Sequence, residues 1–476
     1  MKHSYDAIII GSGPNGLAAA ILLQQQGLSV LIIEGRDEIG GGLRSKELTL
    51  PGFTHDICSA IHPMAQTSPF FSQLPLEQFG LSFLHPVADA AHPFDDGTAA
   101  VLYSSLEKTA ALLGSDRQTY ERLFRPLLED FKELSEDILG PLQLPKHPLT
   151  MARFGLKALP SAMHLAKRFK TREARGLFGG VAAHAIQPLT NIATSAIGLV
   201  LMANSHVSGW PAPKGGAQSL ANALGAYFTS LGGEIVTGTF VKALKELPPS
   251  KAVLLDVTPK QLLQIAGERF TSFYKWQLKR YKYGMGVFKV DWALDGPVPF
   301  TAAGCREAGT VHLGNTIEEI AANEQRTVDG QHPELPYTLF VQHSIFDKTR
   351  APEGKHTAWG YCHVPNGSTK DMTAAIENQV ERFAPGFKDL IIGRHVMNTA
   401  DVEAYNPNYI GGDINGGLLD ITQLYTRPAM RWSPYTTPAK GIYVCSSSTP
   451  PGGGIHGMCG YHAAKKALKD VFGVRL

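Results

Sequence analysis

The sequence lacks several features that would assign a protein to a class at once. Its five cysteines include no CxxC pair and no metal-ligand spacing, so we expect no disulfide framework and no metal site, and a reducing compartment such as the cytoplasm. No run of about 18 apolar residues occurs, which argues against a spanning helix. We also expect no secretory signal, because the apolar run in MKHSYDAIII ends at Gly11.

Strong net charge is also missing. The formal charge is only +2 over 476 residues, so no overall field attracts nucleic acid, and we expect none as a partner. A chain of this length predicts about two domains. Hydrophobic residues make up 43% and charged residues 18%, which is ordinary for a soluble globular protein.

The N-terminal residues form a complete βαβ pattern. The apolar run YDAIII at 5–10 predicts a buried parallel strand, and GSGPNG at 11–16 follows it. A helical pattern at 17–26 ends before Gly27, a suitable C-cap, and the apolar run at 29–34 predicts a second strand.

This pattern predicts a dinucleotide site. Gly11 makes the tight turn, Gly13 allows the backbone to approach a pyrophosphate, and Gly16 lets the helix pack on the strand. The helix N-terminus favours phosphate. Glu34 follows Gly11 by 23 residues and can accept hydrogen bonds from ribose hydroxyls. Its carboxylate would repel a 2′-phosphate, which argues against NADP.

Two further glycine-rich stretches favour FAD. GRDEIGGGLRS at 35–45 adds a flexible turn with Arg36 and Arg44 close by, which suits a longer cofactor, although a surface turn explains it too. STPPGGGIHG at 448–457 follows a predicted strand at 441–445 and precedes a helical pattern from Ile455. A second helix N-terminus would stabilise the negative charge of reduced flavin.

A second GxGxxG motif does not occur in the sequence. No site for a stably bound nicotinamide nucleotide is therefore visible, and we expect oxygen or a quinone as the electron acceptor.

These motifs, with PGFTHDICSAIHPMA at 51–65, resemble those of the phytoene-desaturase-like flavoproteins. That group lies within a wider set of amine oxidases, retinol saturase and prolycopene isomerase. The stretches at 283–300 and 405–417 resemble its bacterial branch of FAD-dependent oxidoreductases, so the resemblance covers most of the chain. Gly42 replaces an arginine typical of amine oxidases, and CSSST at 445–449 lacks their acidic residue; both differences weaken an amine-oxidase interpretation.

The resemblance implies FAD as the cofactor and a binding set spread over five segments. The implied residues are Gly11, Ser12, Gly13, Pro14, Asn15, Gly16, Glu34, Gly35, Arg36, Gly41, Gly42, Leu43, Arg44, Val241, Ser448, Thr449, His456, Gly457 and Met458.

The expected fold class is α/β. A discontinuous Rossmann-type FAD-binding domain (βαβ) would comprise residues 1–75, 215–275 and 420–476. An inserted α+β substrate domain would comprise a largely helical segment, 76–214, and a mixed segment with strands, 276–419.

Catalytic residues are not evident. Weak candidates are His55 and Asp56, which could transfer protons, and Tyr409 and Asp413 in a glycine-rich loop expected to line the flavin–substrate cleft. Packing around the cofactor is the simpler explanation for the first pair, and an ordinary turn series explains the loop.

The sequence predicts an FAD-dependent oxidoreductase of the dehydrogenase or desaturase type, which removes hydride from a small, apolar substrate to flavin N5. Alternatives are a non-redox carotenoid-type isomerase using reduced FAD, a flavin-dependent amine oxidase, and a non-catalytic flavin-binding partner protein. The stretch 151–176 has seven Lys/Arg and one Glu. It could make a peripheral membrane contact, although a solvated helix face explains it more simply.

Overall fold

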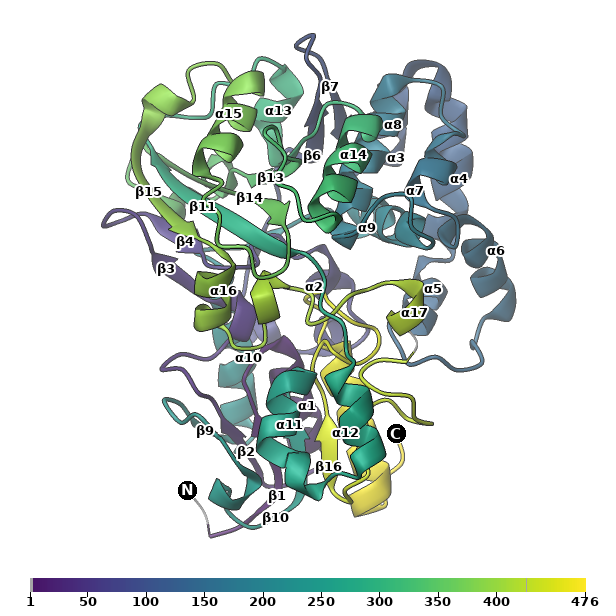
Figure 1. The fold of residues 1–476 in the computed structure, drawn as a ribbon, viewed down its shortest axis with the longest axis vertical. Helices are drawn as coiled ribbons and strands as arrows, with labels where there is room; N and C mark the ends of the chain where they lie inside the picture. The colour runs from purple at the N-terminus through teal and green to yellow at the C-terminus, as the bar shows by residue number, and fades with distance from the viewer. Residues whose placement is uncertain (1–2, 425) are drawn as a thin grey trace.

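The computed structural model describes residues 3–424 and 426–476 and has two parts (Figure 1). The lower part in Figure 1 holds the first and last elements of the chain around a parallel sheet. The upper part holds a mixed sheet and a group of helices. No helix within the described ranges is long and apolar enough to cross a membrane.

The parallel sheet is assembled from three separated stretches of sequence. Its strand order is β16-β10-β1-β2-β9. The bounds are β1 (Tyr5–Ile10), β2 (Val30–Ile33), β9 (Glu234–Val236), β10 (Ser250–Leu255) and β16 (Ile442–Val444). Because side chains alternate along a strand, β1 and β2 bury apolar residues on both faces of the sheet.

Helices cover both faces of this sheet. One face packs against α1 (Pro14–Gln25), α10 (Gln218–Ser230) and α18 (Met458–Ala467). The other packs against α11 (Pro259–Ala266) and α12 (Ser272–Lys279). Ile9 points to the first set and Ile8 to the second, as the alternation of a fully buried strand requires.

The mixed sheet has seven strands in the order β15-β11-β14-β13-β12-β6-β7. The bounds are β6 (Ala88–Pro93), β7 (Ala99–Leu102), β11 (Gly286–Leu294), β12 (Ala308–Leu313), β13 (Thr338–Val341), β14 (His356–Val364) and β15 (Ile391–Met397). One face packs on α13 (Ala303–Glu307) and α15 (Thr373–Phe383). The other face turns toward β4 (Thr54–Asp56), which pairs with β3 (Ser45–Glu47).

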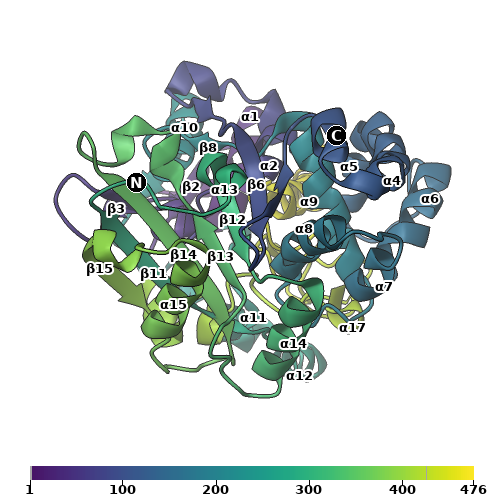
Figure 2. The same ribbon diagram turned by 90° about the horizontal axis from the view of Figure 1, so that it is seen from above.

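The helical segment lies beside the mixed sheet, as the view from above shows (Figure 2). Its helices are α3 (Leu106–Ala111), α4 (Arg117–Glu129), α5 (Phe131–Ile138), α6 (Pro148–Ala158), α7 (Ala162–Ala166), α8 (Arg172–Ala182) and α9 (Thr194–Ser208). The remaining α-helices and strands are α2 (Pro63–Thr67), α14 (Ile317–Val328), α16 (Thr399–Tyr405), α17 (Ile421–Leu424), β5 (Phe83–Leu84) and β8 (Ala212–Pro213).

The predicted fold class is confirmed: an α/β, Rossmann-type domain is interrupted by a second domain with its own sheet. The last helix begins at Met458, three residues later than the pattern from Ile455 indicated. Residues 455–457 remain in the turn because Gly454 and Gly457 have positive φ. The domain limits themselves stay a prediction.

Candidate functional site

A cavity that is partly open to solvent lies at the carboxyl ends of β1, β2 and β10. In parallel α/β sheets this edge is where ligands bind. The glycine-rich turns from both ends of the chain line the same cavity, through Gly11 and Gly13 on one side and Gly453 and Gly454 on the other. The two turns therefore face one elongated space.

The first turn brings backbone close to this space. Gly11 has φ +96°, and a Cβ on Gly16 would overlap the Gly11 carbonyl oxygen. Gly13 is the N-cap of α1 and, as a glycine, has no side chain that could cap the helix. The turn thus offers backbone N–H groups and the positive end of a helix dipole, which together favour a phosphate.

Glu34 is held in place at the end of β2. Its Oε2 accepts hydrogen bonds from the Ser12 backbone nitrogen at 2.9 Å and the Ser12 hydroxyl at 2.6 Å. Its Oε1 accepts from the Arg36 nitrogen at 2.9 Å and lies 3.2 Å from the Arg44 guanidinium. The carboxylate lines the cavity, so its position is fixed before any ligand arrives.

The second glycine turn packs directly on the first. A Cβ on Gly41 would lie 2.9 Å from the Gly13 Cα. Gly41, Gly42 and Arg44 line the cavity, whereas Leu43 is fully buried away from it. Only glycine fits where these two backbone segments meet.

The last helix points its amino end toward the same cavity. A Cβ on Gly460 would overlap the backbone of Asn15, so α18 and α1 pack backbone to backbone. The residues that line the cavity here are Ser446, Ser447 and 453–455.

The predicted Ser448, Thr449, His456, Gly457 and Met458 lie just behind this lining. The Ser448 hydroxyl donates to the Gly416 carbonyl, and the Thr449 hydroxyl donates to the Ser446 carbonyl. His456 accepts from the Met458 nitrogen at 3.0 Å, and burial lowers the pKa of its ring to about 4. Two of the other predicted binding residues, Gly16 and Leu43, also lie behind the lining. The predicted residues that do line the cavity are Gly11, Ser12, Gly13, Pro14, Asn15, Glu34, Gly35, Arg36, Gly41, Gly42, Arg44 and Val241.

Sequence reasoning missed part of the cavity wall. Asp256 directly follows β10 and lines the cavity beside Gly13. Asn406, Pro407 and Asn408 line it from the loop after α16. The signal for Asp256 was a polar residue at the carboxyl end of a buried strand, but its neighbour in the sheet could not be read from the sequence.

Of the four weak catalytic candidates, Tyr409 lines the cavity, and its hydroxyl lies against Gly42. His55, Asp56 and Asp413 do not line it. Asp413 accepts from the Gly284 nitrogen at 2.7 Å and the Asn415 nitrogen at 2.8 Å. These bonds fix the glycine-rich loop.

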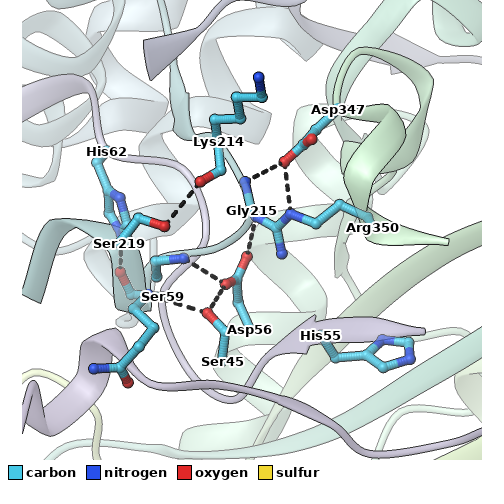
Figure 3. A network of polar contacts seen from close by, with 12 residues as sticks. Ser45, His55, Asp56, Ser59, His62, Lys214, Gly215, Ser219, Asp347 and Arg350 are labelled. Atoms are coloured by element: carbon cyan, nitrogen blue, oxygen red, sulfur yellow. Dashed lines mark hydrogen bonds and ion pairs between the residues drawn. The ribbon is translucent and has the colours of Figure 1, made fainter. Parts of the chain in front are cut away.

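Asp56 belongs to a buried polar network that joins the two parts of the molecule (Figure 3). Its Oδ2 lies 3.0 Å from the Arg350 guanidinium, and its Oδ1 accepts from the Ser45 hydroxyl at 2.6 Å and the Ala217 nitrogen at 2.7 Å. Arg350 also binds Asp347 at 2.9 Å. Burial alone would raise the pKa of Asp56, but the Arg350 charge, together with His343 and the hydrogen bonds from Ser45 and Ala217, outweighs burial and lowers the pKa.

His55 points away from this network (Figure 3), because consecutive residues of β4 face opposite sides. Its ring contacts the Thr49 hydroxyl at 2.8 Å and lies 3.7 Å from the Asp291 carboxylate. Burial lowers its pKa to about 4, so the ring is neutral at physiological pH.

The cavity fits FAD. Three close backbone approaches shape its wall, because a Cβ on Gly16, Gly41 or Gly460 would strike a neighbouring backbone segment. The cavity runs from Glu34 and Val241 at one end to the turn before α18 at the other. Residues in the first turn, Glu34 and Arg44 would hold the adenosine diphosphate half, and the 446–455 turn would hold the flavin half. Among the described residues, no group of three or more His, Cys, Asp or Glu side chains is placed to hold a metal ion.

Comparisons with known proteins agree with this geometry. Residues 9–74 match the model of the NAD(P)-binding Rossmann-like domain. The chain is similar to the rat pyridine nucleotide-disulfide oxidoreductase domain-containing protein 2, at 25% identity over 99% of this chain and 94% of that protein. It is also similar to a limonene dehydrogenase chain of Castellaniella defragrans, at 25% identity over 98% and 95% of the two chains.

Among solved structures, an oxidoreductase from Methanosarcina mazei superimposes with a TM-score of 0.65 at 15% identity, over 97% and 99% of the two chains. Putrescine oxidase superimposes with a TM-score of 0.62 at 17% identity, over 99% of both chains. The chain thus shares its fold with this oxidoreductase and with putrescine oxidase. The fold, the cavity and these relatives agree with an oxidoreductase that uses FAD as its cofactor.

Proposed function

We propose that this enzyme is a phytoene-desaturase-like dehydrogenase that acts on an apolar organic substrate. The observation that carries the proposal is that the face of the mixed sheet next to the cofactor cavity is apolar. That face contributes Val287, Leu339, Trp359, Tyr361 and Met397 to one buried cluster. An apolar wall of this kind recognises its ligand by burial of surface.

The cavity and this wall adjoin each other through Cys58. The Cys58 thiol lies near the Tyr409 hydroxyl at the cavity and close enough to Tyr361 to affect the pKa of that phenol. Burial is the main cause that raises the pKa of the Cys58 thiol, so it stays protonated at neutral pH. The junction between cofactor and substrate is therefore uncharged at Cys58, which suits hydride transfer.

The reaction removes two hydrogens from the substrate. FAD, when bound, supplies the acceptor for the hydride, while the second hydrogen leaves as a proton to water. The chain's own contribution is to orient the substrate along the aromatic wall and to exclude bulk water. The two electrons then pass to oxygen or a quinone. The similarity to the limonene dehydrogenase chain supports a hydrocarbon-like substrate.

A membrane surface is a suitable source of such a substrate. The outward face of α6 carries Leu149 and Leu156, which are 74% and 78% exposed, with Arg153 between them. Leu142 and Leu144 in the preceding loop are also exposed. The stretch 138–172 contains no Asp or Glu. Lys146 and Arg172 at its ends pair with Glu136 and Asp96 outside it. Exposed leucines among the remaining cations favour peripheral contact with an anionic bilayer.

Figure 1 shows α6 at the outer edge of the helical segment. The segment that can contact a membrane is shorter than the basic stretch 151–176, because Phe169 and most of α8 are buried in the protein. The proposed contact is thus the loop before α6 and α6 itself.

Anaerobic mixing tests the function. The FAD-loaded protein is mixed with limonene and, separately, with putrescine, and the oxidised flavin absorbance is followed. Bleaching by the hydrocarbon but not the amine supports the proposal, and the reverse supports an amine oxidase. Conversion of a polyene only by pre-reduced protein, with no net oxidation, supports an isomerase. No response to any member of a broad alkene, polyene and amine panel indicates a non-catalytic flavin-binding protein.

A further inference from the structure

Asp256 is a carboxyl group placed where a dinucleotide needs a positive environment. It follows β10, and its nitrogen donates to the Ile10 carbonyl at 2.8 Å. This bond sets Asp256 beside Gly11, at the start of the glycine-rich turn. A virtual Cβ on Gly11 would lie 3.1 Å from the Asp256 carbonyl oxygen, so the two backbone segments are in contact.

The side chain reaches the amino end of α1. Its Oδ2 accepts from the Gly16 nitrogen at 3.0 Å, and a Cβ on Gly13 would lie only 2.6 Å from the same oxygen. The carboxyl therefore occupies the first turn of the helix and lines the cavity. These are the N–H groups and the helix end that a pyrophosphate also uses.

The charges around Asp256 do not neutralise it. Glu34, directly after β2, faces it, and Arg44 is paired with Glu34. Cys445 after β16 and Cys459 on α18 also face it, and burial raises the pKa of both thiols, so both are neutral. No Lys or Arg within the described part of the chain forms an ion pair with Asp256.

Burial raises the pKa of Asp256 to about 7. The Gly16 hydrogen bond lowers it, and the negative charge of Glu34 raises it again. The carboxyl of Asp256 therefore changes its charge near neutral pH. Adding a doubly charged pyrophosphate at the same helix end favours the neutral acid further, because like charges in one site do not both remain ionised.

We propose that Asp256 is a cofactor-binding residue that takes up one proton when FAD binds. As a neutral acid its Oδ2 still accepts the Gly16 N–H, and its O–H can donate a hydrogen bond to the phosphate group. Where the carboxyl is ionised beforehand, one proton is taken from solvent for each FAD bound. Where it is already protonated, none is taken up, and the oxidation state does not change in either case. This inference rests on FAD as the cofactor.

The consequence is a pH-dependent affinity. Below about pH 6 Asp256 is already protonated and the FAD dissociation constant is flat. Above about pH 7 the ionised carboxyl must regain a proton, so the dissociation constant rises, by up to tenfold per pH unit. The Asp256→Asn variant keeps an acceptor for Gly16 and a donor for phosphate but cannot ionise.

The test is FAD binding to the full-length chain, freed of flavin and shown to be folded by circular dichroism. Quenching of flavin fluorescence gives the dissociation constant from pH 5.5 to 9. We expect a slope near one above pH 7.5 for the wild type and a flat line for Asp256→Asn, which binds at least tenfold more tightly than wild type at pH 8.5. Calorimetry at pH 8 in phosphate and in Tris should show net proton uptake for the wild type and none for the variant.

Two further measurements keep the outcome clear. Glu34→Gln removes the other carboxylate of the cavity and should weaken binding at every pH while keeping the slope. Infrared spectra of the wild-type holoenzyme should show a protonated carboxyl band that Asp256→Asn lacks. Equal slopes in wild type and Asp256→Asn, or no proton uptake by the wild type, overturn this inference alone. No FAD binding by the wild type overturns the cofactor assignment as well.

Discussion

Replacing Arg350 with methionine should strongly destabilise the protein. The guanidinium is fully buried and lies 3.0 Å from Asp56 and 2.9 Å from Asp347. Methionine fills a similar volume but leaves two carboxylates without their shared counter-charge. Breaking a buried ion pair by removing one partner costs about 3–5 kcal/mol. We expect a loss of that size in the free energy of unfolding at pH 7.

The pH dependence of this loss gives the sharper test. The pKa of Asp56 is lowered in the folded wild type, so its ionised form contributes stability above its ordinary pKa and loses it as pH falls. Without Arg350, burial dominates and the Asp56 pKa rises. The variant then holds Asp56 protonated at mild acidity. The gap between wild type and variant should be widest above about pH 6 and shrink toward pH 4.

Urea unfolding of the FAD-loaded protein, followed by circular dichroism between pH 4 and 8, measures this gap. Lys355→Met is the matched control, because its partner Asp295 is about half exposed, and a surface pair contributes at most about 1 kcal/mol. A loss for Arg350→Met below about 1 kcal/mol at pH 7, or a gap that does not narrow on acidification, would refute the reasoning.

Two other variants test the cofactor site and the membrane face. Gly16→Ala should abolish FAD retention, because a Cβ there overlaps the Gly11 carbonyl oxygen. The flavin absorbance of the purified protein measures this, and the control Gly155→Ala, whose Cβ meets nothing within 4 Å, should retain FAD. Normal flavin binding by Gly16→Ala would contradict the proposed role of the glycine-rich turn. The pair Leu149→Glu, Leu156→Glu should abolish co-sedimentation with phosphatidylserine vesicles and leave flavin content unchanged; equal sedimentation of wild type and variant would contradict the proposed contact.

The sequence predicted the parts of the fold that depend on local patterns. The apolar run at 5–10, the turn at 11–16 and the acid at Glu34 form one contiguous unit, and the structure has β1, α1 and β2 there. The C-terminal turn could be predicted equally well, because three consecutive glycines before a helical pattern are typical of a turn and of little else. Its register was less exact: Ser446 and Ser447 line the cavity, with Ser448 and Thr449 behind them.

Long-range neighbours could not be predicted in this way. Asp256 reaches Gly16 across 240 residues only because β10 pairs with β1, and no local pattern sets that order. Asp56 looked like a catalytic candidate because it is next to a histidine, but its partner Arg350 is 294 residues away. A carboxylate's role depends on what faces it, so the same residue type serves the domain junction at Asp56 and the cofactor cavity at Asp256.

The domain junction also bears on the cofactor. Asp56 binds the hydroxyl of Ser45, and the Ile57 nitrogen donates to the carbonyl of Arg44, the residue that pairs with Glu34. Loss of Arg350 should therefore loosen Arg44 and Glu34 together. We expect Arg350→Met to retain less FAD than wild type at pH 7, and to recover part of it near pH 5.5, where Asp56 without Arg350 regains its proton. Flavin released on ultrafiltration measures this, with Lys355→Met again as control. Full retention of FAD by a destabilised Arg350→Met protein would show that the polar network at the domain junction does not affect FAD binding.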